Sequence, residues 1–179
     1  DTELFLRIAP ELFLKRAVVG GIDRVYEINR NFRNEGADRT HSPEFAMLEA
    51  YEAYGDYNTM AALTQALIQN AAMDVFGTLQ VQLEDGEVND LSGDWARISM
   101  FESLSEAAGI EITPETDISV LKKLADKEGL EIDHPQHGKY VEELWEHFVK
   151  GDLQKPTFVM DFPVDTSPLV RNHRSKPGV

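Results

Sequence analysis

Two short segments decide the fold: FRNE at residues 32–35 and HSPEFAMLE at residues 41–49. Each belongs to a longer run in which side chains of different character alternate, over residues 24–32 and residues 44–54. Alternation with a period of two is typical of β-strands. The loop at 34–43 is short enough to join two antiparallel neighbours. We therefore predict that the two runs form an antiparallel β-hairpin.

The two faces of this hairpin differ in composition. The even-numbered positions are apolar or small and are expected to pack on a core: Tyr26, Ile28, Phe32, Ala46, Leu48 and Ala50. The odd-numbered positions mix acids, amides, a cation and aromatic rings. If the register matches, this face gathers Arg33, Glu35, Phe45, Glu49 and Tyr51. The simplest interpretation is the solvated face of an antiparallel sheet.

Two observations favour a binding site over a solvated face. Solvated strand positions usually carry Thr, Lys or Ser, whereas this face carries rings and acids. The connecting loop also contributes Arg39 and His41, so that cations and carboxylates converge. A ring for stacking, fixed cations and accepting carboxylates are what a nucleotide and an ammonium-bearing ligand require.

The composition restricts the possible functions. The 179 residues carry 17 basic and 32 acidic side chains, a net charge of −15, and residues 51–150 alone carry −14. So acidic a chain is not expected to bind nucleic acid through its average field. It contains no cysteine, which excludes disulfides and thiolate sites and fits a reducing cytoplasm. No apolar run approaches the roughly 20 residues of a membrane span, so no membrane partner is expected.

The remaining sequence predicts mainly helices. We expect them at 10–19, 56–76, 99–108, 117–128 and 138–150, with strands at 4–8, 79–83, 87–91 and 157–161, the last of them buried. The local signals are Pro10 in a first helical turn, Asp56 as an N-cap, Gly20, Gly77 and Gly109 as helix ends, Ser99 with Glu102 as a capping box, and Asp85-Gly86 as a hairpin turn.

These elements predict an α+β fold in three parts. Residues 1–98 hold the sheet, the hairpin and a long helix, residues 99–155 form an acidic helical insertion, and residues 156–179 form a returning strand and tail. The chain opens on Asp1 rather than Met and ends without a capping signal, which favours a piece of a longer protein.

The hairpin resembles the second signature motif of class II aminoacyl-tRNA synthetases: an Arg-x-Glu strand, a loop, and a strand with a Phe and an acid. The surrounding sequence narrows the resemblance to lysyl-tRNA synthetases of the bacterial type. It is carried by RIAPEL at 7–12, LKR at 14–16, Gly20-Gly21, YEINRN at 26–31, Tyr51 with Tyr54, PTF at 156–158 and SPL at 167–169. The resemblance covers essentially the whole chain, least well over 78–150. It implies the antiparallel class II sheet flanked by helices, here incomplete.

The resemblance implies an ATP site on the hairpin. Arg33 would be the catalytic residue, contacting the α-phosphate and the carboxylate of the amino acid and stabilising charge on phosphorus. Glu35 would accept a hydrogen bond from the adenine amine, and Phe45 would stack on the adenine ring. His41 would bind the terminal phosphates, with Arg39 assisting. Mg²⁺ is expected to bridge the phosphates, held by residues outside this chain.

The resemblance also implies a lysine site. Glu11 and Glu49 would hold the α-ammonium group, and Tyr51 would lie near the ε-ammonium group. Removing an ammonium group from water is costly unless a carboxylate replaces its hydration, so acids at both ends suit lysine. The implied reaction converts lysine and ATP to lysyl-adenylate and pyrophosphate, and then transfers lysine to tRNA(Lys), in the cytoplasm.

The resemblance leaves alternatives open. The first signature motif (at the dimer interface), the third (with an ATP-binding arginine) and the anticodon-binding barrel are expected outside residues 1–179. We therefore expect the complete protein to be a homodimer and this chain alone to be inactive. A paralogue that lysylates a translation factor or a lipid would share the hairpin, and a truncated scaffold without activity is the non-enzymatic alternative. An aspartate or asparagine enzyme is disfavoured, because a pocket rich in carboxylates repels aspartate.

Overall fold

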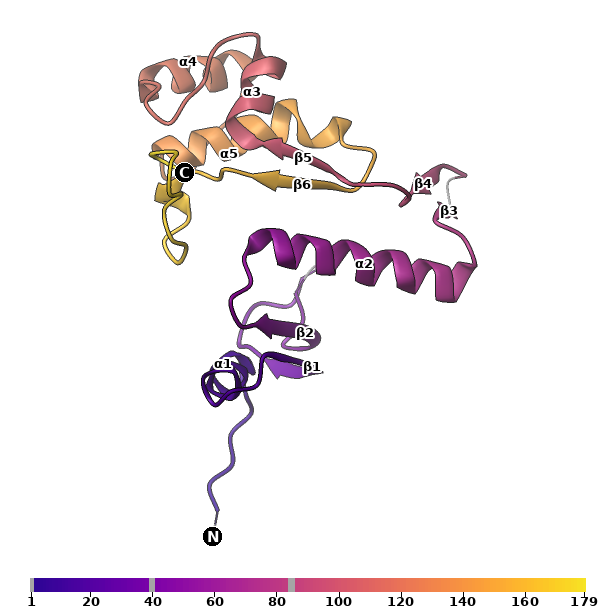
Figure 1. Cartoon of the computed structure of the whole chain (residues 1–179). Helices are drawn as coiled ribbons and strands as arrows, with labels where there is room; N and C mark the ends of the chain where they lie inside the picture. Colours follow the sequence, from indigo (N-terminus) through magenta and orange to yellow (C-terminus); the bar gives the residue numbers. More distant parts are fainter. Residues whose placement is uncertain (1, 39–40, 84–85) are drawn as a thin grey trace. The chain divides into compact units, whose positions relative to one another are not determined.

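The computed structural model describes residues 2–38, 41–83 and 86–179. The chain groups into two compact units, Asp1–Ala62 and Leu63–Val179, called here the N-terminal unit and the C-terminal unit (Figure 1). Helix α2 (Tyr57–Phe76) runs from the first into the second. The boundaries that the sequence suggests at residues 98 and 155 divide the chain differently, and they stay predictions.

The N-terminal unit is built around the predicted hairpin. Strands β1 (Arg24–Phe32) and β2 (Glu44–Glu52) pair antiparallel, with Asn31 opposite Phe45. This register places odd-numbered residues opposite odd-numbered ones, as the sequence requires for a shared face. Strand β2 ends two residues earlier than predicted, and Tyr54 adopts a left-handed conformation with φ of 61° as the chain turns toward α2.

Helix α1 (Glu11–Val19) precedes the hairpin and begins where the proline signal predicts it. The carbonyl oxygen of Pro10 accepts hydrogen bonds from the backbone N–H groups of Phe13 and Leu14, at 3.0 and 3.1 Å. Proline loses nothing at this point, because its missing N–H would have no partner inside the helix. Gly20 ends the helix, as predicted.

The predicted strand at residues 4–8 is wrong, because this segment has no strand conformation in the structure. Among the described residues its backbone forms one hydrogen bond with the backbone of β1, from the N–H group of Phe32 to the carbonyl oxygen of Arg7 at 2.9 Å. The side chain of Arg7 adds a hydrogen bond from Nε to the carbonyl oxygen of Arg30 at 3.0 Å. A strand requires a ladder along its length, and an apolar run alone does not supply the partner.

The burial of the hairpin is the reverse of the predicted one. Most of the even-numbered residues expected in a core are exposed, with 71% for Tyr26, 64% for Ile28 and 46% for Leu48, whereas Phe32 and Ala50 are half-buried. Helix α1 covers the odd-numbered face instead, where Lys15 lies over the ring of Tyr51. Alternation shows that one face is apolar, but it does not show which face receives the helix of the same unit.

The C-terminal unit has a hydrophobic core of its own. Helices α3 (Met100–Ala108), α4 (Ile118–Glu128) and α5 (His137–Phe148) confirm the three predicted helices and pack on one another (Figure 1). The fully buried residues between them are Leu104, Ile112, Leu121, Val141 and Leu144.

Two small sheets complete this unit. Strands β3 (Gln80–Gln82) and β4 (Val88–Asp90) form the predicted antiparallel hairpin, and β5 (Ala96–Ser99) pairs in parallel with β6 (Thr157–Met160). Strand β6 is half-buried rather than buried, because it pairs with β5 alone in the described part of the chain. Short 3₁₀ helices follow at Lys150–Asp152 (η1) and Val164–Thr166 (η2).

The local signals differ in how well they predict the contacts. Asp56 caps α2 as expected, because its Oδ1 accepts from the N–H groups of Asn58 and Thr59 at 2.9 and 3.0 Å. Ser99 does start α3, but its hydroxyl makes no capping hydrogen bond, so the capping box is wrong. Asp85 of the predicted turn lies outside the described residues.

The chain is therefore a mixed α+β structure with small two-stranded sheets. Among its described helices, none combines the length and the apolar character needed to cross a membrane.

Candidate functional site

The odd-numbered face of the hairpin brings together a cation and a ring. The N–H group of Arg33 donates to the carbonyl oxygen of Pro43 at 3.0 Å, which extends the pairing by one step beyond β1. Its guanidinium carbon lies 5.3 Å from the centre of the Phe45 ring. The Arg33 Nε group also donates to the carbonyl oxygen of Ile8 at 3.3 Å. The guanidinium group is thus held beside a half-buried aromatic surface, a combination suited to a phosphate and a base.

A second cluster lies further along the same face, near α1. The hydroxyl of Tyr51 donates to Oε2 of Glu49 at 3.0 Å. On α1, Lys15 forms an ion pair with Glu11, and its Nζ lies 5.5 Å from the centre of the Tyr51 ring. The two acids predicted to hold an ammonium group therefore both lie around Tyr51.

The protonation of Tyr51 is fixed by this environment. Burial, the hydrogen bond to Glu49 and the negative charges of Glu49 and Glu11 raise the pKa of Tyr51 to about 12. The phenol therefore stays neutral in the physiological range and acts toward Glu49 as a donor.

A third acid on this face is already neutralised. Glu27 lies directly opposite Glu49 in the register and forms an ion pair with Nη1 of Arg7 at 2.5 Å. The hydrogen bonds from Arg7 and Asn29 lower the pKa of Glu27. Within the described residues, by contrast, Glu49 has a neutral phenol as its hydrogen-bond donor and no cation paired with it. Glu49 is thus the acid on the hairpin that is free to bind an ammonium group.

The loop residues are less well placed for chemistry. His41 is tied to Asp38 by a backbone hydrogen bond of 2.8 Å and a contact of 2.9 Å from its Nδ1. Glu35 is exposed, and Arg39 lies outside the described residues. No group of three or more metal-ligating side chains is found in the described part of the chain. The structure therefore brings Arg33 and Glu49 to one face of the hairpin, with Glu11 on the helix that covers it. The contacts of the loop at residues 34–43 do not assign it a chemical role.

Three residues on or next to this face were missed by the sequence reasoning. Lys15 follows Glu11 by four positions, and this spacing predicts an ion pair on a helix. The sequence therefore contained a signal that could have identified Lys15. Asn31 has no exposed surface, and neither atom of its amide has a described partner. Nη2 of Arg7 is also buried without a described partner. Nothing in the local sequence predicts such unsatisfied atoms.

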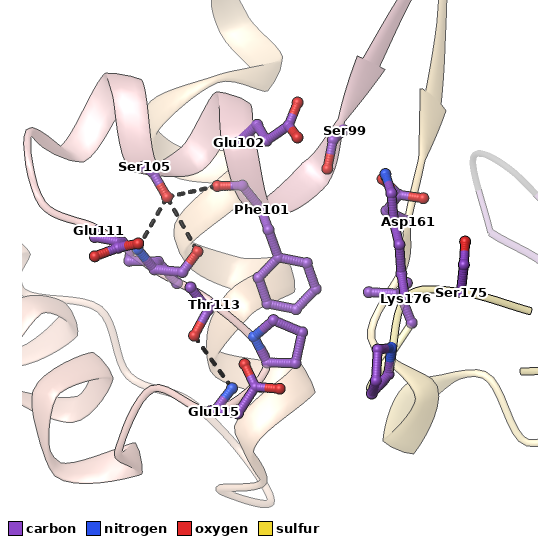
Figure 2. Close-up of a pocket in the computed structure, with 14 residues that line it drawn as sticks. Ser99, Phe101, Glu102, Ser105, Glu111, Thr113, Glu115, Asp161, Ser175 and Lys176 are labelled. Atoms are coloured by element: carbon purple, nitrogen blue, oxygen red, sulfur yellow. Dashed lines mark hydrogen bonds and ion pairs between the residues drawn. The ribbon is translucent and has the colours of Figure 1, made fainter. Parts of the chain in front are cut away.

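The described residues also form a hollow in the C-terminal unit, with a volume of about 640 Å³ (Figure 2). Glu102, Glu111 and Glu115 contribute carboxylates to its lining. The hydroxyl of Ser105 is engaged with the backbone, accepting from the N–H group of Ile112 at 2.9 Å. None of the predicted site residues lines this hollow.

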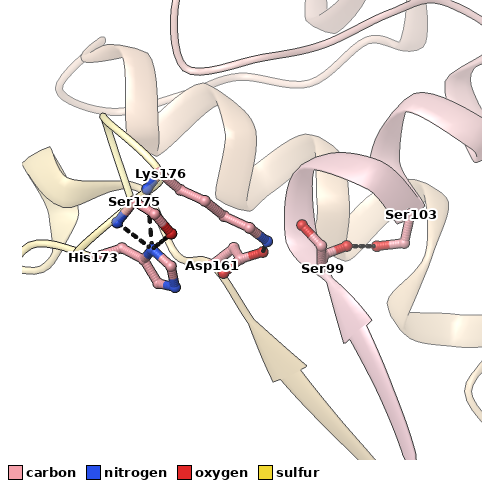
Figure 3. Close-up of polar contacts among 6 residues, drawn as sticks. All are labelled: Ser99, Ser103, Asp161, His173, Ser175 and Lys176. Atoms are coloured by element: carbon pink, nitrogen blue, oxygen red, sulfur yellow. Dashed lines mark hydrogen bonds and ion pairs between the residues drawn. The ribbon is translucent and has the colours of Figure 1, made fainter.

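Polar side chains beside the hollow are engaged with the backbone or with one another (Figure 3). Nδ1 of His173 accepts from the N–H groups of Ser175 and Lys176 at 3.2 and 3.0 Å. Nζ of Lys176 pairs with Oδ2 of Asp161 at 2.6 Å. Nδ1 of His173 is thus engaged by the backbone of residues 175 and 176, and the candidate site remains on the hairpin.

Known proteins resemble this chain over its whole length. The sequence model of the family "tRNA synthetases class II (D, K and N)" matches residues 1–178. The chain belongs to this family. The lysine–tRNA ligase of Kineococcus radiotolerans is 64% identical over the whole chain, which covers 36% of that ligase. The lysine–tRNA ligase of Mycolicibacterium gilvum is 60% identical, with the same coverage. A lysylphosphatidylglycerol biosynthesis bifunctional protein of Nocardia farcinica is 47% identical, and the chain covers 16% of it.

The class II synthetase segment thus spans little more than a third of the lysine–tRNA ligases that it matches. The resemblance read from residues 32–49 is confirmed at the level of the family and of its lysine-specific members. The role of each site residue stays a prediction, since the comparisons match whole segments rather than single side chains.

Proposed function

We propose that this chain is a segment of the catalytic domain of a lysine–tRNA ligase. The observation that carries the proposal is the shared face of the hairpin, where the Arg33–Phe45 pair and the Glu49–Tyr51 pair lie on the same side. One pair suits a nucleotide and the other suits an ammonium group. In this proposal the hairpin is part of the antiparallel class II sheet, and the complete protein is a cytoplasmic homodimer.

The first step joins lysine to the α-phosphate of ATP. An oxygen of the lysine carboxylate attacks the α-phosphorus, a new P–O bond forms, and the bond to the β-phosphate breaks with release of pyrophosphate. Negative charge rises on the phosphoryl oxygens during this displacement. Arg33 carries a fixed positive charge and planar donors, so it orients both reactants and stabilises this charge.

The nucleotide and its phosphates use the remaining residues of the hairpin. Phe45 stacks on adenine, an interaction worth about 1–3 kcal/mol per base in comparable sites. Glu35 accepts from the adenine amine, and His41, with Arg39, contacts the terminal phosphates. Mg²⁺ supplies charge neutralisation of the phosphates when bound, and we assign its ligands to parts of the protein beyond this chain.

The amino-acid site distinguishes lysine by its two ammonium groups. Glu11 and Glu49 replace the hydration of the α-ammonium group, and Tyr51 lies near the ε-ammonium group. Lysyl-adenylate then loses AMP when a hydroxyl of the terminal adenosine of tRNA(Lys) attacks its carbonyl carbon. No covalent bond to the protein is required in either step.

A graft tests the proposal. The chain replaces the matching segment of the lysine–tRNA ligase of Kineococcus radiotolerans, to which it is 64% identical. We expect lysine-dependent ATP–pyrophosphate exchange near the rate of the parent enzyme, and we expect the chain by itself to show none. A graft that melts at the parent's temperature but does not exchange pyrophosphate contradicts the proposal.

A lysyl-transferring relative is the second candidate, because the Nocardia farcinica protein is 47% identical over the whole chain. Both candidates make the same adenylate, so the graft does not separate them. The coding sequence on either side of the chain does: an anticodon-binding barrel favours tRNA, whereas membrane helices favour a lipid acceptor. A translation-factor ligase or an inactive scaffold is tested by adding tRNA(Lys) to the complete protein with radiolabelled lysine.

A further inference from the structure

The helix that covers the site carries an ammonium group of its own. Lys15 lies on α1, one turn after Glu11, and pairs with the carboxylate of that residue. The same Nζ atom lies 5.5 Å from the centre of the Tyr51 ring, whose hydroxyl donates to Glu49. The Lys15 ammonium group is therefore held by an acid and an aromatic ring, the surroundings proposed for the ammonium group of the ligand.

We propose that Lys15 is a resident competitor, which neutralises Glu11 in the free protein and must leave it when lysine binds. This inference rests on the proposed function, since it assigns Glu11 to the ligand. The bound lysine brings two ammonium groups to the face. The α-ammonium group reaches Glu49 without displacing a cation and takes Glu11 from Lys15, whereas the ε-ammonium group lies near Tyr51.

The two ion pairs on this face show why Lys15, and not Arg7, is the one displaced. The side chains of Arg7 and Glu27 are 27% and 31% exposed, and Arg7 is also bound to the backbone of β1. The side chains of Lys15 and Glu11 are 53% and 48% exposed. A half-exposed lysine returns to water at little cost, because exposed ion pairs contribute little. Arg7 is a fixed part of the site, and Lys15 is an exchangeable one.

Because Lys15 competes for Glu11, it lowers the affinity of the site for lysine. Loss of the Lys15 charge leaves Glu11 unneutralised before binding, so that lysine no longer has to replace a cation. A purely structural Lys15, which orients Glu11 for the ligand, predicts the opposite sign. The direction of the change therefore decides between the two roles.

The grafted ligase described above provides the test. With Lys15→Met, we expect the KM for lysine in pyrophosphate exchange to fall about two- to fivefold, the range that corresponds to an exposed ion pair. The change should appear in the KM for lysine rather than in kcat or the KM for ATP. Lys15→Arg keeps the charge and should restore the KM for lysine of the unmodified graft. Lys122→Met removes an equally exposed ion pair, with Asp126 on α4, and serves as the control.

The possible outcomes separate the two proposals. An active graft in which Lys15→Met leaves the KM for lysine unchanged, or raises it, overturns the competitor and leaves the proposed function in place. A well-folded graft without activity overturns the proposed function and the competitor with it. A lowered KM for lysine that Lys15→Arg does not restore also overturns the competitor, because the effect then does not come from charge.

Discussion

The two units of the molecule use their buried residues in opposite ways. In the C-terminal unit, three helices enclose a continuous apolar core that includes Leu104, Leu121 and Leu144. In the N-terminal unit, the fully buried side chains include the amide of Asn31, which has no described partner. The C-terminal unit buries mainly apolar side chains, which stabilise its fold, whereas the N-terminal unit holds charges and polar atoms close together. The candidate site therefore lies in the unit that has the smaller buried apolar core.

The largest expected effect tests the stability half of this comparison. Leu144→Ala opens a cavity in the C-terminal core and should cost about 2–5 kcal/mol in the free energy of unfolding. Leu48→Ala, on the exposed face of the hairpin, is the matched control and should cost far less. Urea unfolding followed by tryptophan fluorescence measures the first change, because both tryptophans lie in the C-terminal unit. Equal losses for both variants would contradict the comparison.

The next effect tests the chemical half. Arg33→Ala in the grafted ligase removes the charge beside Phe45 and should lower kcat about a hundredfold or more, as expected for a group that stabilises transition-state charge. The control is Arg97→Ala, which removes a similar contact, with the guanidinium carbon 5.8 Å from the Phe158 ring in the C-terminal unit. Pyrophosphate exchange at saturating lysine and ATP gives both values. A comparable loss for the two variants would mean that Arg33 acts through folding.

A smaller effect concerns the buried amide of Asn31. Because neither amide atom has a described partner, an apolar side chain of similar size should fit without a lost hydrogen bond. Asn31→Leu should therefore raise the free energy of unfolding by about 1 kcal/mol, whereas an amide with a hidden partner would make the variant less stable by a similar amount. Thermal unfolding of Asn31→Leu and of the unmodified chain, each followed by circular dichroism, gives the sign of the change in the free energy of unfolding.

The last effect, which appears only at alkaline pH, is the pH dependence of Tyr51. Its pKa is about 12 in the folded chain against an ordinary value of 10.0, so the neutral phenol favours the folded state. The associated stability is fully present below pH 10 and is lost as the pH rises through 12. Tyrosinate absorbance should show a late-titrating component that Tyr51→Phe removes and Tyr26→Phe leaves in place. A late component that survives Tyr51→Phe would refute the assignment.

Most local signals in the sequence predict helix ends correctly, although the capping box of Ser99 with Glu102 does not form. Pro10 and Gly20 mark the ends of α1, and Asp56 marks the start of α2, because caps and stops act within one turn. The conformation of residues 4–8 could not be predicted from the local sequence, because a segment becomes a strand only where a distant segment pairs with it along its length. The exposure of Ile28 was missed for the same reason, because burial is decided by which layer arrives on which face.

In the candidate site, too, the features set by local spacing could be predicted, whereas those set by distant contacts could not. The strand period puts Phe45 and Glu49 on one face, and the register seen in the structure adds Arg33 to that face. The ion pair of Arg7 with Glu27 joins residues 20 positions apart and has no local signal. Lys15 was within reach of the sequence, because helical spacing connects it to Glu11. It was missed because the charge of a helix surface is usually assigned to solvent.

The antiparallel register of β1 and β2 has a consequence for how this family can change. An insertion or deletion in the connecting loop leaves every residue of the two strands on its own side. A deletion of one residue between Phe45 and Glu49 would instead turn the Phe45 ring and the Glu49 carboxylate, proposed here to bind adenine and an ammonium group, to opposite sides. Lineages are therefore free to vary the length of the loop, while the spacing within each strand tolerates only changes by two.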